Sequence, residues 1–195
     1  AAAPYRQADL RSEPAVAELL DGCGAVLHFS EFDPAWGANA QADLDALEHA
    51  SLGTYRLFLR AREQGIGRVV MASSLKFFDA YPKDYAIDEL WRPWPATDAP
   101  SLAPFLAETV AHEICREGGI GCVCLRMLPL GDDRALNTTP DDAMQAIEKA
   151  LAVEFKTPGY RWQVYHIAAT ERIITRSARL GLGFVAKEGP RDGWH

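Results

Sequence analysis

The stretch Val69-Val70-Met71-Ala72-Ser73-Ser74 decides the fold of this chain, together with the later stretch Ala103-Pro104-Phe105-Leu106-Ala107-Glu108-Thr109. The first stretch predicts a buried strand, because a short continuous apolar run is typical of a strand that is covered on both faces. Two hydroxyls end it. The second stretch predicts the first turns of a helix. The remaining elements can be laid out around this strand and this helix.

Short apolar runs alternate with longer amphipathic stretches along the chain. Strands are expected over residues 24–29, 68–72, 120–128 and 160–168, and helices over residues 12–22, 41–64, 104–117, 143–153 and 172–180. Alternating elements of this kind predict right-handed strand–helix–strand units and a parallel sheet that is covered by helices on both faces.

Local signals place some helix ends and faces. Ser12 and Thr139 are expected to cap helices with their hydroxyls, because each is followed closely by a proline that suits a first helical turn. Within residues 41–64, apolar and small residues recur at steps of three and four, which predicts one inner face. That face is expected to hold Leu44, Leu47, Ser51, Tyr55 and Phe58.

Composition limits the classes of protein that need to be considered. The 195 residues suffice for one domain with a substantial core, and 48% hydrophobic with 24% charged residues is ordinary for a globular protein. The net charge of -7 argues against non-specific binding to nucleic acid. No apolar run is long enough to span a membrane, and no signal segment opens the chain. We therefore expect neither a membrane partner nor a nucleic-acid partner.

The cysteines and histidines do not form a metal-binding pattern. None of Cys23, Cys115, Cys122 and Cys124 belongs to a Cys-x-x-Cys pair, and the five histidines show no ligand spacing. No metal site is expected. Cys122 and Cys124 alternate on a predicted strand and are expected to pack as small apolar groups on one face. Reduced thiols favour a cytoplasmic location.

Several segments, in order, resemble one family. They are Ala8-Asp9-Leu10, Leu19 to Ser30, Gly67 to Ser74, Asp88-Glu89 before Pro93 and Pro95, Pro104-Phe105 with Glu113, Leu125 to Pro129, His166-Ile167 and Leu182 to Phe184. This ordered set resembles the extended short-chain dehydrogenases/reductases of the NAD-dependent epimerase/dehydratase family. The resemblance implies an α/β fold with a Rossmann-like parallel sheet, helices on both faces and a small C-terminal substrate region.

The same resemblance implies two functional regions along the chain. Residues 1–133 correspond to a partial nucleotide-binding domain, and residues 134–195 to a C-terminal substrate or cap region within one structural domain. The implied cofactor is NAD or NADP. Residues implied to contact it are Asp9, Leu10, His28, Phe29, Ser30, Met71 and Pro129. Residues implied to contact a sugar or sugar-nucleotide substrate are Ser73, Lys76, Trp91 and Arg126.

The chain departs from the family by lacking a glycine-rich turn. The sequence contains no Gly-x-Gly-x-x-Gly, the turn whose backbone N–H groups contact the pyrophosphate of a dinucleotide. The first strand–helix–strand unit is therefore absent from this sequence, which is either a fragment or a shortened protein. NAD or NADP stays the cofactor that the resemblance implies, but the absence of that turn argues against its binding to this sequence alone. A sheet without its neighbouring strand would expose edges, so association with a second chain, such as a homo-oligomer, is expected.

A second departure concerns catalysis. In the family, a serine acts with a tyrosine that transfers a proton and a lysine that lowers the pKa of its phenol. Ser74 matches the serine, but Phe105 stands at the tyrosine position and Thr109 at the lysine position. General acid–base catalysis contributes about 10²–10⁴-fold to a rate, so its loss predicts impaired or altered catalysis.

Several of these residues have structural interpretations as well. Ser73 and Ser74 could satisfy backbone groups at a strand end, Asp9 could serve only a helix start, and Lys76 could lie in a solvated loop. Trp91, with Trp94, could pack a loop onto the core. Arg126 could bind a phosphate or pair with a carboxylate. Glu108 and His112 share a helix face; they could form an acid–base pair near Phe105, but an exposed helix pair is expected.

Two functions therefore remain open. One is an NAD(P)-dependent oxidoreductase of the epimerase/dehydratase type, acting on a sugar or sugar-nucleotide with impaired or altered catalysis. The other is a catalytically inactive homologue that binds a ligand or a protein.

Overall fold

The computed structural model describes residues 5–29, 37–133, 135–155 and 159–187. Four strands within these residues form one sheet in the order β1-β2-β3-β4, and every neighbouring pair is parallel. The strands are β1 (Val26–His28), β2 (Arg68–Ser74), β3 (Gly121–Met127) and β4 (Trp162–Ile167). All four were expected from the sequence, with ends that differ by one or two residues.

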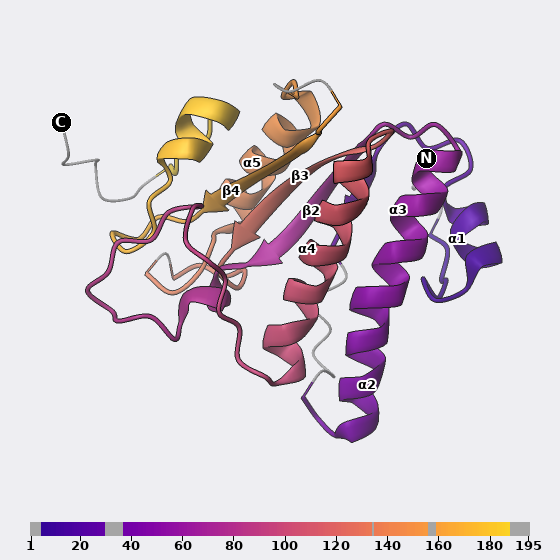
Figure 1. The fold of residues 1–195 in the computed structure, drawn as a ribbon. Helices are drawn as coiled ribbons and strands as arrows, with labels where there is room; N and C mark the ends of the chain where they lie inside the picture. Colours follow the sequence, from indigo (N-terminus) through magenta and orange to yellow (C-terminus); the bar gives the residue numbers. More distant parts are fainter. Residues whose placement is uncertain (1–4, 30–36, 134, 156–158, 188–195) are drawn as a thin grey trace.

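Helices cover both faces of the sheet, with α2, α3 and α4 in front of it and α5 behind it (Figure 1). The longer helices are α1 (Glu13–Leu19), α2 (Ala40–Glu48), α3 (Thr54–Glu63), α4 (Ala99–Glu117) and α5 (Pro140–Ala152). Shorter segments are η1 (His49–Gly53) and η3 (Ala178–Leu182), which are π-helical turns, and η2 (Leu75–Phe78), a 3-10 turn. The predicted α/β, Rossmann-like architecture is confirmed.

The two faces of β2 and β3 belong to different hydrophobic cores, because side chains alternate along a strand. On the side of α4, Met71, Cys122 and Cys124 pack among the alanines of that helix. On the side of α5, Val70 and Leu125 pack among its alanines. The prediction that the two cysteines of β3 pack on one face is therefore confirmed.

Helix α4 begins at Ala99, five residues before the position expected from the sequence. Asp98 caps it, since its carboxylate accepts a hydrogen bond of 3.0 Å from the backbone N–H of Ser101. Pro104 lies inside the helix rather than at its beginning. A proline within the second turn leaves one backbone carbonyl without its usual donor but does not end this helix.

The helix expected over residues 41–64 contains a π-helical turn, η1, between α2 and α3. A π turn accommodates one extra residue and rotates the faces on either side of it relative to each other. Consequently Leu44 and Tyr55, both expected on the inner face, are about half exposed, whereas Phe58 is fully buried. The predicted single inner face was wrong.

Two further local expectations can be compared with the structure. The Thr139 hydroxyl caps α5 by accepting a hydrogen bond from the N–H of Asp142, as predicted. Ser12 precedes α1, but its side chain makes no cap hydrogen bond, so that prediction was wrong. The helix expected over residues 172–180 is largely the shorter turn η3, displaced toward the C-terminus.

Strand β1 lies at one edge of the sheet, and among the described residues it pairs only with β2. Leu27 on this strand is 49% exposed. No helix in the described part of the chain is long and apolar enough to cross a membrane.

The close packing at the beginning of β3 gives a test of the fold. A Cβ at Gly121 would lie 2.5 Å from the Phe155 ring and 2.9 Å from Cβ of Arg161. We expect Gly121→Ala to lower the free energy of unfolding by about 1–3 kcal/mol, because overpacking forces neighbours to move. Urea unfolding measures the change. Gly67→Ala is the matched control, since in the described part of the chain no atom beyond its two chain neighbours lies within 4 Å of its Cβ position. Equal effects of the two substitutions would contradict the packing described.

Candidate active site

A buried polar cluster connects α4 to the ends of β2 and β3. Ser73 and Arg126 are register partners on these strands, and Glu108 projects between them from α4. The Ser73 hydroxyl donates a hydrogen bond of 2.7 Å to Oε2 of Glu108. Arg126 binds the same carboxylate with two nitrogens, Nε at 3.1 Å from Oε2 and Nη2 against Oε1. This two-pronged geometry is the strong form of an arginine–carboxylate pair.

The cluster is almost fully removed from water, with Glu108 8% and Arg126 5% exposed. Burial by itself lowers the pKa of Arg126, but the charge and hydrogen bonds of Glu108 oppose it, and the pKa of the guanidinium is raised. The guanidinium also lies over the Phe78 ring, 5.5 Å from its centroid. Removing one member of a buried pair typically costs about 3–5 kcal/mol, so the two side chains are interdependent.

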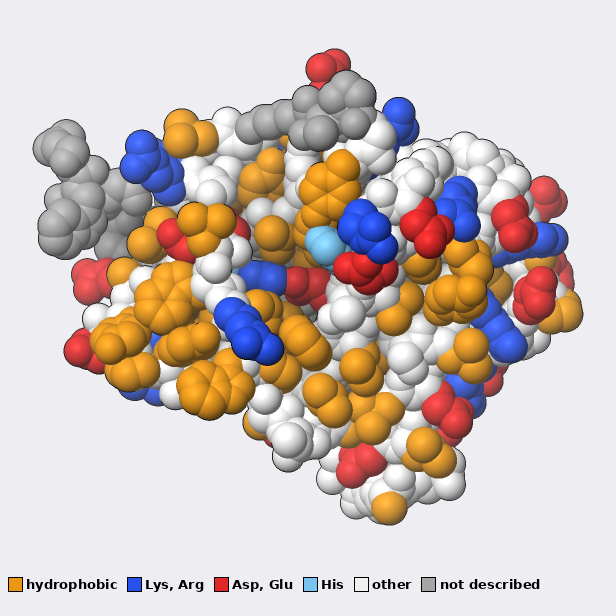
Figure 2. Space-filling view, viewed as in Figure 1, with side chains coloured by type: hydrophobic (Ala, Val, Ile, Leu, Met, Phe, Trp, Pro, Cys, Tyr) orange, Lys and Arg blue, Asp and Glu red, His pale blue; other side chains and the backbone are white. Residues whose placement is uncertain are grey.

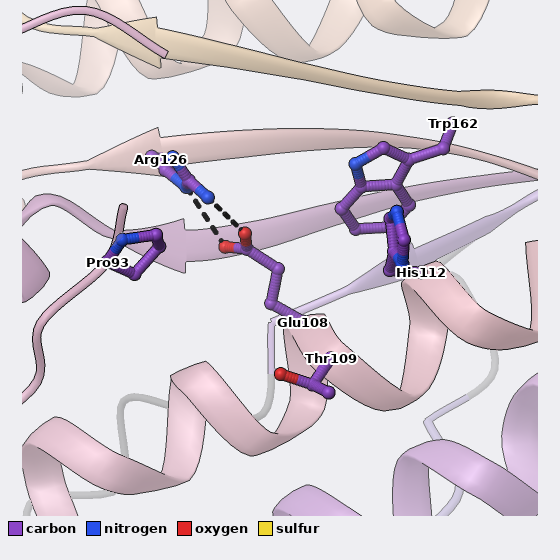
Figure 3. Close-up of a pocket in the computed structure, with 6 residues that line it drawn as sticks. All are labelled: Pro93, Glu108, Thr109, His112, Arg126 and Trp162. Carbon is purple, nitrogen blue, oxygen red and sulfur yellow. Dashed lines mark hydrogen bonds and ion pairs between the residues drawn. The ribbon is translucent and has the colours of Figure 1, made fainter. Parts of the chain in front are cut away.

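A pocket of about 270 Å³ opens beside this cluster. Figure 3 shows the residues that line it: Pro93, Glu108, Thr109, His112, Arg126 and Trp162. Seen from the same side as the ribbon, the surface is hollowed near the centre of this face, where charged, histidine and hydrophobic side chains meet (Figure 2). The pocket therefore combines a charged floor with partly aromatic walls.

His112 and Trp162 form one wall of the pocket. Their rings meet edge to face with centroids 5.3 Å apart. Nδ1 of His112 lies 2.9 Å from Oε1 of Glu113, and Nε2 lies 2.9 Å from the Tyr160 hydroxyl. These contacts fix the orientation of the imidazole ring, so that the wall has a defined shape.

The three residues predicted at the catalytic positions lie around the end of β2 and the facing turn of α4. Ser74 ends β2, and its Oγ accepts a hydrogen bond of 3.1 Å from the N–H of Lys76, which caps η2. Phe105 packs edge to face on Phe77 of η2, with ring centroids 6.0 Å apart. The Thr109 hydroxyl donates to the Phe105 carbonyl at 2.8 Å. Thr109 lines the pocket, whereas Ser74 and Phe105 are not among its lining residues.

The residues predicted to bind substrate do not all come together. Ser73 and Arg126 meet at Glu108, and Arg126 has the carboxylate partner that the sequence left as one of two possibilities. Lys76 is exposed, away from the pocket lining. Trp91 packs against Tyr81, with ring centroids 5.0 Å apart, as a loop residue on the core.

The residues predicted to contact the cofactor are engaged within the protein. Asp9 pairs with Arg11, and this hydrogen bond lowers the pKa of its carboxyl. His28 is buried, with Nε2 3.0 Å from the Thr54 hydroxyl, and burial lowers its pKa to about 4. Three of the remaining residues belong to the hydrophobic cores: Leu10 packs on the core beside α2 and α4, Phe29 packs on the core beside α5, and Met71 is fully buried. The Pro129 carbonyl accepts a hydrogen bond from the backbone N–H of Thr138. Ser30 lies outside the described residues.

The described residues do not fit a complete NAD(P) site. A dinucleotide site needs backbone N–H groups at a glycine-rich turn before a helix, where they contact the pyrophosphate. The sequence contains no such turn, and the described residues that were predicted to contact the cofactor are buried or partnered. In the described part of the chain, no three histidine, cysteine or acidic side chains gather in a way that could hold a metal ion.

The sequence-based prediction that Glu108 forms an exposed pair with His112 was wrong. The structure buries Glu108 against the sheet and leaves His112 at the pocket wall. A signal for the buried position was present, since Arg126 lies within a nearly all-apolar strand. A buried arginine requires a carboxylate from a neighbouring element.

The sequence also attached no role to a second buried residue, His166. It is the register partner of Arg126 and is fully buried, and among the described residues neither ring nitrogen makes a hydrogen bond of normal geometry. Burial and the charge of Arg126 lower its pKa to about 3, and the nearby backbone of Ile87 opposes this shift only in part. His166 is therefore a neutral, closely packed ring in the folded protein.

The parallel sheet, its covering helices and the polar cluster at the ends of β2 and β3 define a protein of the Rossmann-like α/β class. Comparison with known proteins gives the family. The family model of the NAD dependent epimerase/dehydratase family matches residues 2–157. The chain belongs to this family.

Individual relatives are similar over almost the whole chain. Uronate dehydrogenase from Pseudomonas putida is 26% identical over 200 residues, which cover 96% of this chain and 70% of the relative. The solved structure of a mutated uronate dehydrogenase is also 26% identical, with a TM-score of 0.72, covering 93% of this chain and 65% of that chain. This chain thus spans just under two thirds of that enzyme.

A second similar structure is MoeE5 in complex with UDP-glucuronic acid and NAD. Its TM-score is 0.76 at 18% identity, and the match covers 96% of this chain and 82% of that chain. At this identity the likeness concerns the fold alone.

The buried histidines make the stability of the protein dependent on pH. The pKa of His166 is lowered from 6.5 to about 3, so the unfolded chain binds a proton below about pH 6.5 that the folded chain rejects. We expect the free energy of unfolding to fall as the pH is lowered from about 7 to 5, by at most about 1.4 kcal/mol per pH unit for each such histidine.

Urea unfolding at several pH values measures this dependence, and His166→Leu should reduce the slope by about half, because His28 still contributes. Leucine removes the titrating ring without removing a side-chain hydrogen bond of normal geometry. His49→Gln, at a partly exposed position, is the control and should keep the slope of the wild type. Parallel profiles for the wild type and His166→Leu would show that His166 is not the origin of the effect.

Proposed function

We propose that this chain is part of an NAD(P)-linked oxidoreductase that acts on a sugar acid or a sugar nucleotide, with slow proton transfer. The observation that carries the proposal is the contact of Phe105 with Phe77, in the turn that follows Ser74. This contact supports the assignment of Phe105 to the tyrosine position, because it holds Phe105 against the turn that directly follows Ser74. A uronate dehydrogenase among the similar proteins supports a sugar acid as the substrate, and membership of the NAD dependent epimerase/dehydratase family supports a dinucleotide as the cofactor.

The chemistry available at these positions is limited. Phe105 has no exchangeable proton, and the Thr109 hydroxyl is uncharged and engaged with a backbone carbonyl. Ser74 can contribute only hydrogen bonds that orient a carbonyl or hydroxyl of the substrate. The phosphates of a bound cofactor would have to be held by residues other than those described. Slow turnover follows, because positioning remains while acid–base catalysis is removed.

Restoring the missing pair tests the proposal. In the intact protein, we expect Phe105→Tyr combined with Thr109→Lys to raise the rate of NAD reduction with D-glucuronate or D-galacturonate. The gain should approach the roughly 10²–10⁴-fold contribution of acid–base catalysis, because a lysine beside a phenol lowers its pKa toward neutrality. Absorbance of the reduced nicotinamide measures the rate.

The single variants and one misplaced phenol serve as controls. Phe105→Tyr alone should give a smaller gain that appears at higher pH, since a phenol without a neighbouring ammonium titrates near pH 10. Phe77→Tyr combined with Thr109→Lys places the phenol on η2 rather than on α4 and should give no gain. If the combined Phe105 and Thr109 substitutions bring no turnover although NAD(H) binds, slow proton transfer is not the defect.

Phe105 and Thr109 also support a second candidate function. The packing of Phe105 and the internal hydrogen bond of Thr109 favour a homologue that binds its ligand without converting it. Fluorescence titration with NADH distinguishes the two. Absence of NADH binding by the intact protein would reject the oxidoreductase and leave the binding protein.

A further inference from the structure

A long loop over residues 79–95 lies between η2 and α4, beside the C-terminal segment of the chain (Figure 1). Its inward side chains belong to a third hydrophobic cluster, which includes Phe78, Ile87 and Ile173 and takes no described residue from the four strands. Small satellite clusters of this kind are typical under long loops. A unit with so little apolar burial of its own opens at a lower free energy than the sheet cores.

One residue, Arg172, holds this loop at its beginning and in its middle. Nη2 of Arg172 donates hydrogen bonds of 2.7 Å to the Phe78 carbonyl and 3.1 Å to the Tyr81 carbonyl. The backbone carbonyl of Arg172 accepts a hydrogen bond of 2.8 Å from the N–H of Ile87. Hydrogen bonds from a charged donor are roughly twice as strong as neutral ones. The guanidinium is therefore a strong polar link between the loop and the C-terminal segment.

The outer side of the loop contributes little to this closed position. Leu90 is 92%, Trp94 60% and Tyr85 46% exposed. Figure 2 shows hydrophobic side chains gathered where this loop lies in Figure 1. Apolar side chains stabilise a position only through the area that they remove from water. The hydrogen bonds of Arg172 therefore supply a large share of the free energy that keeps the loop in place.

The loop covers the buried polar cluster of the candidate site. Pro93 lines the pocket on which that cluster opens. Oε1 of Glu89 accepts a hydrogen bond of 3.1 Å from the backbone N–H of His166, the register partner of Arg126. The Phe78 ring, at the beginning of the loop, lies over the Arg126 guanidinium. Movement of the loop away from the sheet therefore uncovers the cluster.

We propose that residues 79–95 form a lid over the pocket beside α4, and that Arg172 is the latch that keeps this lid closed. When the guanidinium releases the carbonyls of Phe78 and Tyr81, the lid opens as one unit. A ligand then reaches the pocket while the sheet stays folded. This gating requires neither a cofactor nor a reaction, so it goes beyond the proposed oxidoreductase activity.

Limited digestion of the intact protein with chymotrypsin tests the proposal. Tyr85 and Leu90 are exposed side chains of the lid, but a protease needs the segment around them to be locally unfolded. The rate of cleavage then follows the open population. We expect Arg172→Gln to speed cleavage at both residues by at least about tenfold and by the same factor, because two charge-assisted hydrogen bonds are lost and one opening exposes both sites.

Chemical labelling of Arg126 gives a second readout. Phenylglyoxal reacts with accessible guanidinium groups, and Arg126 is only 5% exposed in the closed protein. Mass spectrometry of the labelled peptides should show that Arg172→Gln speeds the modification of Arg126 by about the same factor as the cleavage of the lid. Unchanged labelling of Arg126 would contradict a lid that covers the polar cluster.

Arg116→Gln is the matched control, because Arg116 is an exposed arginine whose ion pair with Glu113 lies on α4, away from the lid. It should leave both rates unchanged. Arg172→Lys keeps a charged donor and should speed cleavage less than glutamine does, which keeps the test decisive if Arg172→Gln does not fold. Circular dichroism verifies the fold of each variant.

Three outcomes would overturn the proposal: unchanged cleavage in folded Arg172→Gln, factors at Tyr85 and Leu90 that differ by more than about threefold, or wild-type cleavage that rises in urea in parallel with global unfolding. None of these measurements uses a nucleotide or a sugar. The turnover test of the combined Phe105 and Thr109 substitutions can therefore fail or succeed independently of the lid.

Discussion

The pairing of Arg126 with Glu108 is the constraint on which the centre of this molecule depends. An arginine within a buried strand can be tolerated only if a carboxylate meets it there, because a lone buried charge is strongly unfavourable. Glu108 meets this need from α4, and Ser73 occupies one of the remaining lone pairs of the carboxylate. The helix is therefore fixed in rotation and height against β2 and β3, which sets the positions of Phe105 and Thr109 one helical turn or less away.

The pairing of Glu108 with Arg126 also determines where Thr109 and Phe105 lie relative to the pocket. Glu108 points toward the sheet, so its neighbour Thr109 is turned toward the opening and Phe105 toward the 3-10 turn η2. Phe105 makes an aromatic contact with Phe77 that a tyrosine at the same position could also make. The fold of the family is retained, and the proposed function rests on assigning Phe105 and Thr109 to the positions where proton-transfer groups are expected.

Much of the fold could be predicted from the sequence, because continuous apolar runs such as Val69–Ala72 leave few alternatives to a buried parallel strand. The errors have specific physical origins. A π-helical turn at residues 49–53 shifts the faces of a helix, and a periodicity of 3.6 cannot reveal it. Pro104 resembled a helix beginning, although Asp98 with Pro100 gives the stronger signal. Glu108 was misplaced because helix neighbours cannot show which strand residue lies opposite.

The N-terminal segment has a consequence for how the molecule opens. Arg11 forms ion pairs with Asp45 and Glu48 on α2. Leu10 packs closely against Gly53, because a Cβ atom added at Gly53 would lie only 3.1 Å from Cβ of Leu10. The segment that precedes α1 is therefore clamped to the middle of a helix pair rather than lying loosely on it. Local opening around Leu10 and Arg11 is therefore coupled to opening of that helix pair, so amides in both regions should exchange with solvent at similar rates.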